Sequence, residues 1–227
     1  MKTMVLSLGG SLIIPDKINY PLLEKLKIIL RKNYKNYKFA IVCGGGAIAR
    51  AYISAMKKER KSNYEISQAG IRATRMNALF MAHFFGKEAN STLPRNMQEV
   101  KNQLKKNNVV FCGALRWVPN STSDSTTAKL ASFLKTDFIN LTNVSGLYTS
   151  NPLTNKNAKF ISHENWKRFE KRALKIPFKA GEHFVLDQRA STIIRKHKIK
   201  TYIIGKDLRN LESILKGKKF TGTTISG

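Results

Sequence analysis

Short apolar runs alternate along this chain with longer segments of helical periodicity, and this alternation restricts the possible folds more than any other feature. The apolar runs predict strands at Met4–Leu8, Phe39–Cys43, Val109–Cys112, Phe138–Thr142, Thr201–Ile204 and, as a last edge strand, Thr223–Ile225. The periodic segments predict helices at Tyr20–Lys32, Ala47–Lys58, Gln68–Phe85, Asn96–Lys106, Asp124–Lys135, Asp187–His197 and Leu208–Lys216. Residues 147–159 are expected to be irregular. This alternation indicates an α/β protein with a mainly parallel sheet covered on both faces.

The length and composition are those of a globular protein. The 227 residues suffice for one large domain or two small ones, and 42% of them are hydrophobic. No apolar run approaches the ~18 residues of a membrane span, and no signal-peptide pattern opens the chain. The two cysteines, Cys43 and Cys112, lie inside apolar runs. We therefore expect a cytoplasmic protein with reduced thiols and no membrane partner.

The charge balance is unusual, with 41 Lys and Arg residues against 14 Asp and Glu residues and a net charge of +27. Such an excess favours phosphate-bearing partners, including nucleic acid, but does not define a fold. The basic residues are spread along the chain and form no tail of like charges. A nucleic-acid partner is therefore permitted by the charge but not required by it.

Glycine-rich turns follow directly after several predicted strands. The first two are Gly9-Gly10-Ser11 and Gly44-Gly45-Gly46, and Gly113 follows a third strand. Ligands of open α/β sheets bind beyond the carboxyl ends of the strands. There, glycine lets the backbone approach a ligand closely, and successive N–H groups can hold phosphate. Two such turns predict one cleft that holds more than one phosphate group.

A cation follows the second glycine turn. Arg50 lies four residues after Gly46, so in a helix that starts near Ala47 it occupies the first turn. Its guanidinium could bind phosphate through its fork of donors. The alternative is an ordinary arginine that faces solvent, and the sequence leaves both open.

Two nucleotide-binding motifs were tested against this pattern. The P-loop motif G-x-x-x-x-G-K-[ST] is absent, whereas Gly44–Ala49 fits the dinucleotide motif G-x-G-x-x-[GA]. Glu65 lies at about the distance along the chain where that motif has an acid that binds the ribose. That acid should end a second strand, but residues 61–66 are polar and have no strand character. This argues against a dinucleotide-dependent oxidoreductase.

Several motifs occur together in an order typical of one known family. They are Gly9-Gly-Ser11, Val42-Cys-Gly-Gly-Gly46-Ala-Ile-Ala-Arg50, Gly70-Ile-Arg-Ala-Thr-Arg-Met-Asn77, Thr142-Asn-Val-Ser-Gly-Leu-Tyr148 and Ile204-Gly-Lys206. In this order they resemble the amino acid kinase family, and within it the archaeal type of uridylate kinase. The similarity extends over nearly the whole chain.

The resemblance implies a single domain over residues 1–227, folded as a three-layer α/β/α sandwich. It implies that the γ-phosphoryl group of ATP is transferred to UMP to give UDP, with Mg²⁺ bound alongside ATP. The N-terminal part would bind mainly the acceptor nucleotide and the C-terminal part mainly ATP. The resemblance also implies a homo-oligomer, namely a hexamer built from dimers.

Matching positions to the family's motifs implies three sets of site residues. The implied catalytic residues are Arg50 and Asp187, and Lys179 is added to them as a hypothesis because Lys179-Ala-Gly181 precedes Asp187. The implied ATP-binding residues are Gly9, Gly10, Ser11, Gly46, Arg50, Thr142, Asn143, Tyr148 and Asn151. The implied UMP-binding residues are Gly45, Ser67, Gly113, Ala114, Ser121 and Thr122. No side chains are expected to bind a metal directly, because the histidines and cysteines lack metal-ligand spacing.

The chain departs from the family pattern at its usual lysines. Bacterial relatives carry a lysine where Ser7 stands, and archaeal relatives often carry one where Ala47 stands. Charge stabilisation must then come from Arg50, from Mg²⁺ or from another lysine, for which Lys179 is the candidate because it precedes Asp187 in a matching motif.

The acceptor loop departs from the family as well, because residues 114–120 are unusually apolar. Trp117 in this loop could stack on a base or simply pack against the protein. Other acceptors therefore stay open, such as carbamate, an amino acid or an isoprenoid phosphate. A catalytically impaired homologue that binds nucleotide or RNA is a further alternative.

Overall fold

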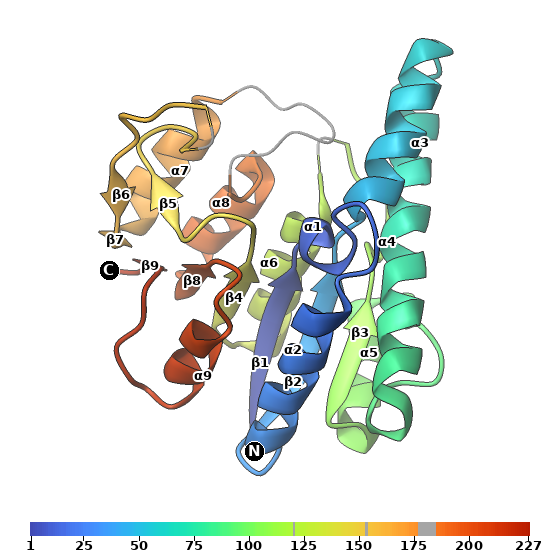
Figure 1. Ribbon diagram of the computed structural model, residues 1–227, viewed down its shortest axis with the longest axis vertical. Coiled ribbons are helices and arrows are strands. Elements are labelled where there is room, and N and C mark those ends of the chain that lie inside the picture. The colour runs from blue at the N-terminus through green and yellow to red at the C-terminus, as the bar shows by residue number, and fades with distance from the viewer. Residues whose placement is uncertain (120, 153, 177–184) are drawn as a thin grey trace.

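The computed structural model describes residues 1–119, 121–152, 154–176 and 185–227. Its centre is a seven-stranded sheet in the order β3-β2-β1-β4-β8-β9-β7 (Figure 1). The strands are β1 (Lys2–Leu8), β2 (Tyr37–Cys43), β3 (Val109–Cys112), β4 (Phe138–Leu141), β7 (His163–Glu164), β8 (Thr201–Ile204) and β9 (Thr223–Ile225). Neighbours from β3 to β8 are parallel, whereas β9 is antiparallel to β8 and parallel to β7. The mainly parallel sheet is thus confirmed.

The central parallel strands end level with one another. Leu8 of β1 pairs with Cys43 of β2 and with Leu141 of β4, and Leu141 pairs in turn with Ile204 of β8. The segments that follow these strands therefore leave from one edge of the sheet. In a parallel sheet this carboxyl edge is where ligands bind.

Helices cover both faces of the sheet, as the strand sequences require, because parallel strands with two apolar faces must be buried on both. One face carries α2 (Tyr20–Asn33), α4 (Asn63–Phe85) and α9 (Arg209–Leu215). The other carries α5 (Met97–Lys106), α6 (Ser123–Leu134) and α8 (Gln188–Lys196), and α7 (Trp166–Leu174) packs beside α8. A separate apolar core fills each side. The arrangement is the expected α/β/α sandwich (Figure 1).

The remaining elements lie around the carboxyl edge or close the helical layers. Helix α1 (Gly10–Ile13) follows β1 directly, and α3 (Gly46–Lys58) follows β2 and packs against α4. A 3₁₀ helix, η1 (Gly86–Glu88), follows α4 directly. Strands β5 (Leu147–Tyr148) and β6 (Phe160–Ile161) form a separate antiparallel ribbon.

The structure differs from the sequence expectations in several places, among them the unpredicted helix α7. Helix α4 begins at Asn63, five residues before the predicted start, because Ser62 and Glu65 form a capping box. Strand β9 is not an edge strand, because β7 lies outside it. The segment 147–159 was expected to be irregular, but it begins with strand β5. This strand pairs with β6 and so joins the two ends of the segment between them.

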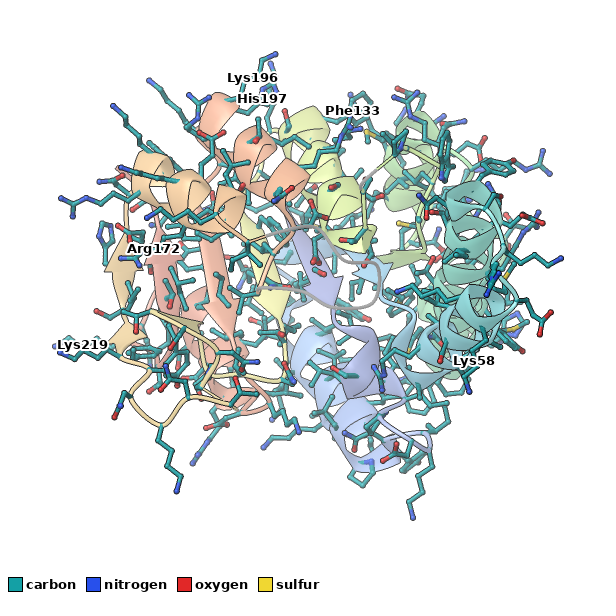
Figure 2. The ribbon with its side chains drawn as sticks, turned by 90° about the horizontal axis from the view of Figure 1, so that it is seen from above. Lys58, Phe133, Arg172, Lys196, His197 and Lys219 are labelled. Atoms are coloured by element: carbon teal, nitrogen blue, oxygen red, sulfur yellow. The ribbon has the colours of Figure 1, made fainter. Side chains whose placement is uncertain are left out.

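The cysteines and the charged surface agree with a reduced globular chain. Cys43 and Cys112 are free and buried, and burial raises the pKa of Cys112 to about 12. Figure 2 shows Lys58, Lys196 and Lys219 projecting from three different sides of the molecule. None of the described helices combines the length and the apolar character that crossing a membrane requires.

Candidate active site

A cleft of about 780 Å³ opens at the carboxyl edge of the sheet, and both glycine turns line it. Gly9, Gly10 and Ser11 follow β1, and Gly44–Gly46 follow the adjacent strand β2. Because β1 and β2 are parallel and end level, the two turns meet at the centre of the cleft. The single shared cleft predicted from the sequence is therefore present.

The two turns pack backbone against backbone, which only glycine allows at this spacing. A Cβ on Gly10 would lie 2.7 Å from the carbonyl carbon of Gly44 and 2.7 Å from the amide nitrogen of Gly45, closer than any tolerated contact. Gly46 has a φ of +63°, in the left-handed region that favours glycine. The sequence of the turns is thus explained by their close approach.

The cleft extends from this glycine centre in two directions. We call one part the α4 arm; it lies beyond β2 and β3 and includes Lys57, Ser67, Ile71, Ala114, Arg116 and Trp117. We call the other part the β5 arm; it lies beyond β4 and includes Thr142, Asn143, Gly146, Tyr148, Ser150 and Asn151. Figure 1 shows β1 and β2 between β3 and β4 in the sheet. The residues of the two arms follow strands on opposite sides of this central pair, so we place the arms on opposite sides of the glycine centre.

Most residues implied by the family resemblance line this one cleft. From the ATP set, Gly9, Gly10, Ser11, Gly46 and Arg50 lie at the centre, and Thr142, Asn143, Tyr148 and Asn151 lie in the β5 arm. From the UMP set, the cleft is lined by Gly45, Ser67, Ala114, Ser121 and Thr122. Whether each binds its expected nucleotide stays a prediction.

Three implied residues have other placements. Gly113 does not line the cleft; a Cβ there would lie 2.6 Å from the backbone nitrogen of Arg75, so the glycine lets the β3 loop pack on α4. Lys179 lies outside the described residues. Asp187 is buried beneath the cleft rather than lining it.

Asp187 joins the N-terminal ends of two helices. Its carboxylate accepts hydrogen bonds from the backbone and hydroxyl of Thr122, at 3.2 and 2.5 Å, and from the backbone and hydroxyl of Ser125, at 3.2 and 2.7 Å. It also caps α8 by accepting from the amide of Ala190 at 2.7 Å. With so many donors around it, Asp187 is better suited to positioning α6 against the cleft than to contacting a substrate.

Two cleft side chains implied by the resemblance have partial anchors within the protein. Arg50 lines the cleft and donates from Nη2 to the carbonyl of Pro15 at 3.1 Å, which uses one guanidinium donor and leaves others for a ligand. The Ser67 hydroxyl donates to the carbonyl of Asn63 at 2.6 Å, so its oxygen can still accept a hydrogen bond from a ribose hydroxyl.

Asp124 is a cleft residue that the sequence analysis treated only as the start of a helix. It is buried, lines the cleft, and accepts a hydrogen bond of 2.9 Å from the hydroxyl of Ser7. Ser7 stands where bacterial relatives carry a lysine, so a neutral donor takes that place next to Asp124. The signal for this residue was an isolated acid near a helix start, in a chain that has few acids.

The charge of the cleft is concentrated on one side. Among the described residues that line it, the cations are Arg50, Lys57 and Arg116, and Asp124 is the acid. Burial, with the nearby guanidinium groups of Arg189 and Arg116, lowers the pKa of Lys129. The α4 arm is therefore bordered by a cationic region that suits a phosphorylated ligand.

These features define a class of protein: an α/β protein with a mainly parallel sheet and a glycine-lined cleft at its carboxyl edge. The sequence model of the amino acid kinase family matches residues 2–205, and the chain belongs to this family. It is 33% identical over 224 residues to a uridylate kinase of Pyrococcus abyssi, covering 98% of each chain.

Solved structures agree with this placement. The structure superposes on that of a uridylate kinase from Archaeoglobus fulgidus with a TM-score of 0.82, 31% identity and full coverage of both chains. A UMP kinase structure from Bacillus anthracis has a TM-score of 0.81 at 20% identity and covers 99% of this chain and 96% of its own. The second similarity concerns the fold alone.

Proposed function

We propose that this protein is a UMP kinase, which transfers the γ-phosphoryl group of ATP to UMP. The observation that carries the proposal is the two-armed cleft, in which the glycine turns after β1 and β2 meet between two separate ligand spaces. Two nucleotides with facing phosphates fit this arrangement. The archaeal relatives, which match over almost the whole chain, are uridylate kinases.

In this proposal UMP occupies the α4 arm and ATP the β5 arm, so the N-terminal part of the domain holds mainly the acceptor. A phosphate oxygen of UMP attacks the γ-phosphorus of ATP in line. The bond between that phosphorus and the bridging oxygen of ADP breaks, and UDP and ADP result. The protein contributes positioning and electrostatic stabilisation, which dominate phosphoryl transfer.

The charge that develops in this step is met by groups around the glycine centre. Backbone N–H groups of the two turns and the guanidinium of Arg50 are available there. We expect Lys179 to add a further positive charge. ATP would bring Mg²⁺, which neutralises phosphate charge, and Asp124 offers the one described carboxylate that lines the cleft. One carboxylate together with nucleotide phosphates is a usual environment for Mg²⁺.

A coupled assay of ADP release, with UMP, CMP and carbamate as parallel acceptors, tests the proposal. We expect turnover with UMP to exceed that with the other two, and Lys179→Ala to reduce kcat without a matching change in the KM for UMP. Turnover with carbamate alone would support another member of the family. No turnover with any acceptor, together with salt-sensitive RNA binding, would support an impaired homologue.

We also propose that the protein forms a homo-oligomer, as the family resemblance implies. The support is the apolar surface on α2 and α4, where Tyr20 is 54% exposed and Met76 is 60% exposed. Tyr20 packs edge-on against Phe84 of α4, so this surface is continuous between the two helices. Light scattering after size exclusion measures the oligomeric state, and a monomer at micromolar concentration would contradict the proposal.

A further inference from the structure

Trp117 of the α4 arm forms an aromatic pair with Tyr64, which comes from a separate segment and does not itself line the cleft. Trp117, in the loop after β3, lines the cleft and is 38% exposed. Tyr64, in the first turn of α4, contacts it edge to face, with ring centroids 5.2 Å apart and planes at 79°. A large ring that stays partly exposed in a cleft, while a second ring supports it, is available to stack on a ligand.

Hydrogen bonds of neighbouring residues hold the backbone segments that carry the two rings. The capping box between Ser62 and Glu65 holds the first turn of α4, which carries Tyr64. Arg75 of α4 donates to the carbonyls of Ala114 and Leu115 at 3.1 and 3.0 Å, which anchors the beginning of the Trp117 loop. The ring of Trp117 is therefore presented from an anchored loop rather than a free one.

The β5 arm has a similar arrangement. Tyr148 lines that arm, and Phe160 contacts it edge to face with centroids 5.4 Å apart and planes at 70°. The glycine turns thus lie between two aromatic pairs, one in each arm. A nucleotide has a phosphate at one end and a flat base at the other, so two nucleotides with facing phosphates would place one base at each pair.

We propose that Trp117, held by Tyr64, is the base-stacking platform of the acceptor site and makes this site prefer a nucleotide to a small acid. This inference rests on the proposed function, which places the acceptor in the α4 arm. Stacking requires only the π face of a base, so the platform selects nucleobase-bearing acceptors as a class. Arg116, the neighbouring residue in the loop, also lines the cleft and provides positive charge beside the platform.

The chain contains a matched fluorescence control, because it has two tryptophans. Trp166 starts α7, is partly buried against the core on the α6 side of the sheet, and donates from its indole N–H to the carbonyl of Ile199 at 2.9 Å. Trp166 does not line the cleft. Trp166→Phe leaves Trp117 as the sole indole, and Trp117→Phe leaves only Trp166.

UMP is the probe for these two variants. We expect UMP to quench the emission of Trp166→Phe in a saturable way and to leave the emission of Trp117→Phe unchanged. ATP alone should change neither emission. An emission of Trp117 that responds to ATP but not to UMP would overturn the assignment of the platform to the acceptor.

Affinity measurements by calorimetry separate stacking from general damage to the site. Trp117→Ala should raise the Kd for UMP about 5- to 100-fold, the range for loss of one stacked base. The Kd for ribose 5-phosphate, which has no base, should change less than about twofold, and Trp117→Phe should keep most of the affinity for UMP. Equal losses for UMP and ribose 5-phosphate would refute stacking.

The outcomes also distinguish this inference from the proposed function. If the wild-type enzyme phosphorylates UMP and Trp117→Ala does so with an unchanged KM, the platform is wrong and the kinase function stands. If the wild-type enzyme neither binds nor phosphorylates UMP, both proposals fail. Circular dichroism of each variant verifies that it is folded before its affinity is interpreted.

Discussion

The contact between the two glycine turns gives the most direct test of the site, through Gly10→Ala. An added Cβ would lie 2.7 Å from the carbonyl carbon of Gly44 and from the amide nitrogen of Gly45, and closer still to the amide nitrogen of Gly46. All three atoms belong to the backbone, so no side chain can rotate away. The methyl group can be accommodated only if the two turns separate.

The size of the effect follows from these distances. Carbon atoms pack favourably at about 3.5–4.0 Å, so the turns must move apart by roughly 1 Å. A displacement of that size at groups which position reactants costs about 100-fold in rate, or about 2.7 kcal/mol of transition-state stabilisation. Overpacking should also reduce the free energy of unfolding by about 1–3 kcal/mol.

The assay is ADP release with saturating ATP and varied UMP, together with urea unfolding followed by circular dichroism. Gly217→Ala is the matched control, because Gly217 has a φ of +66° and lies outside the cleft lining. It should lose about 1–2 kcal/mol of stability through backbone strain but keep kcat/KM within about twofold. A Gly10→Ala enzyme with wild-type kcat/KM would refute the argument that the turns form the phosphate site.

Three other substitutions test separate parts of the structure. Asp187→Asn should lower the free energy of unfolding, measured in urea, by at least about 2 kcal/mol, because several donors lose a charged acceptor. The control Asp207→Asn, which removes a surface ion pair with Arg209, should cost less than about 1 kcal/mol. Equal losses for the two variants would contradict the role of Asp187 in holding α6 and α8 together. Gly70→Ala should raise the free energy of unfolding by about 0.5–1 kcal/mol, because Gly70 lies inside α4, where alanine is the better helix former. A Cβ at this position would have only the Ile53 side chain nearby, at 3.4 Å. A loss of stability would contradict this open environment. Burial alone would raise the pKa of Glu88, but hydrogen bonds from Arg31 and Tyr34 outweigh it and hold the pKa below the ordinary value of 4.5. The stability that Glu88 contributes is therefore fully present above pH 4.5 and is lost as the pH falls through the lowered pKa. The difference in free energy of unfolding between the wild type and Glu88→Gln should therefore shrink in acid. A difference that grows in acid would contradict this.

The sequence predicted the buried strands well because their apolar runs are continuous. Strands Val109–Cys112 and Thr201–Ile204 have the predicted bounds, since both of their faces are covered. The start of α4 was missed because its first turn is polar and exposed, although the pattern Ser62-x-x-Glu65 was a readable capping signal. Helix α7 was missed because nine mostly charged residues carry only a short apolar stripe.

The parts of the candidate site that could be predicted depend on neighbouring residues in the sequence, and the parts that could not depend on contacts between distant residues. The glycine turns could be predicted because each follows its strand directly in the sequence. The hydrogen bond between Ser7 and Asp124 joins residues 117 positions apart, and the contact of Tyr64 with Trp117 joins a helix start to a loop beyond the next strand. No local pattern contains such pairs, because the packing of β1 on α6 and of α4 on β3 creates them.

The distribution of charge along the cleft bears on how a chain without the usual lysines could transfer phosphate. Of the described cations that line the cleft, Arg50 of α3 lies at the glycine centre, whereas Lys57 of α3 and Arg116 of the loop after β3 lie in the α4 arm. The side chains that line the β5 arm are neutral in the described residues. If ATP occupies the β5 arm and UMP the α4 arm, as proposed, the described positive side chains of the lining lie at the glycine centre and on the acceptor side. That distribution would attract the terminal phosphates of ATP to the glycine centre and would stabilise the charge of the transferred phosphoryl group. We therefore expect the cations of the α4 arm, together with Arg50, to take over the role of the lysine absent at Ser7 and Ala47, because the transition state requires positive charge near the transferred group and not at one fixed position in the sequence.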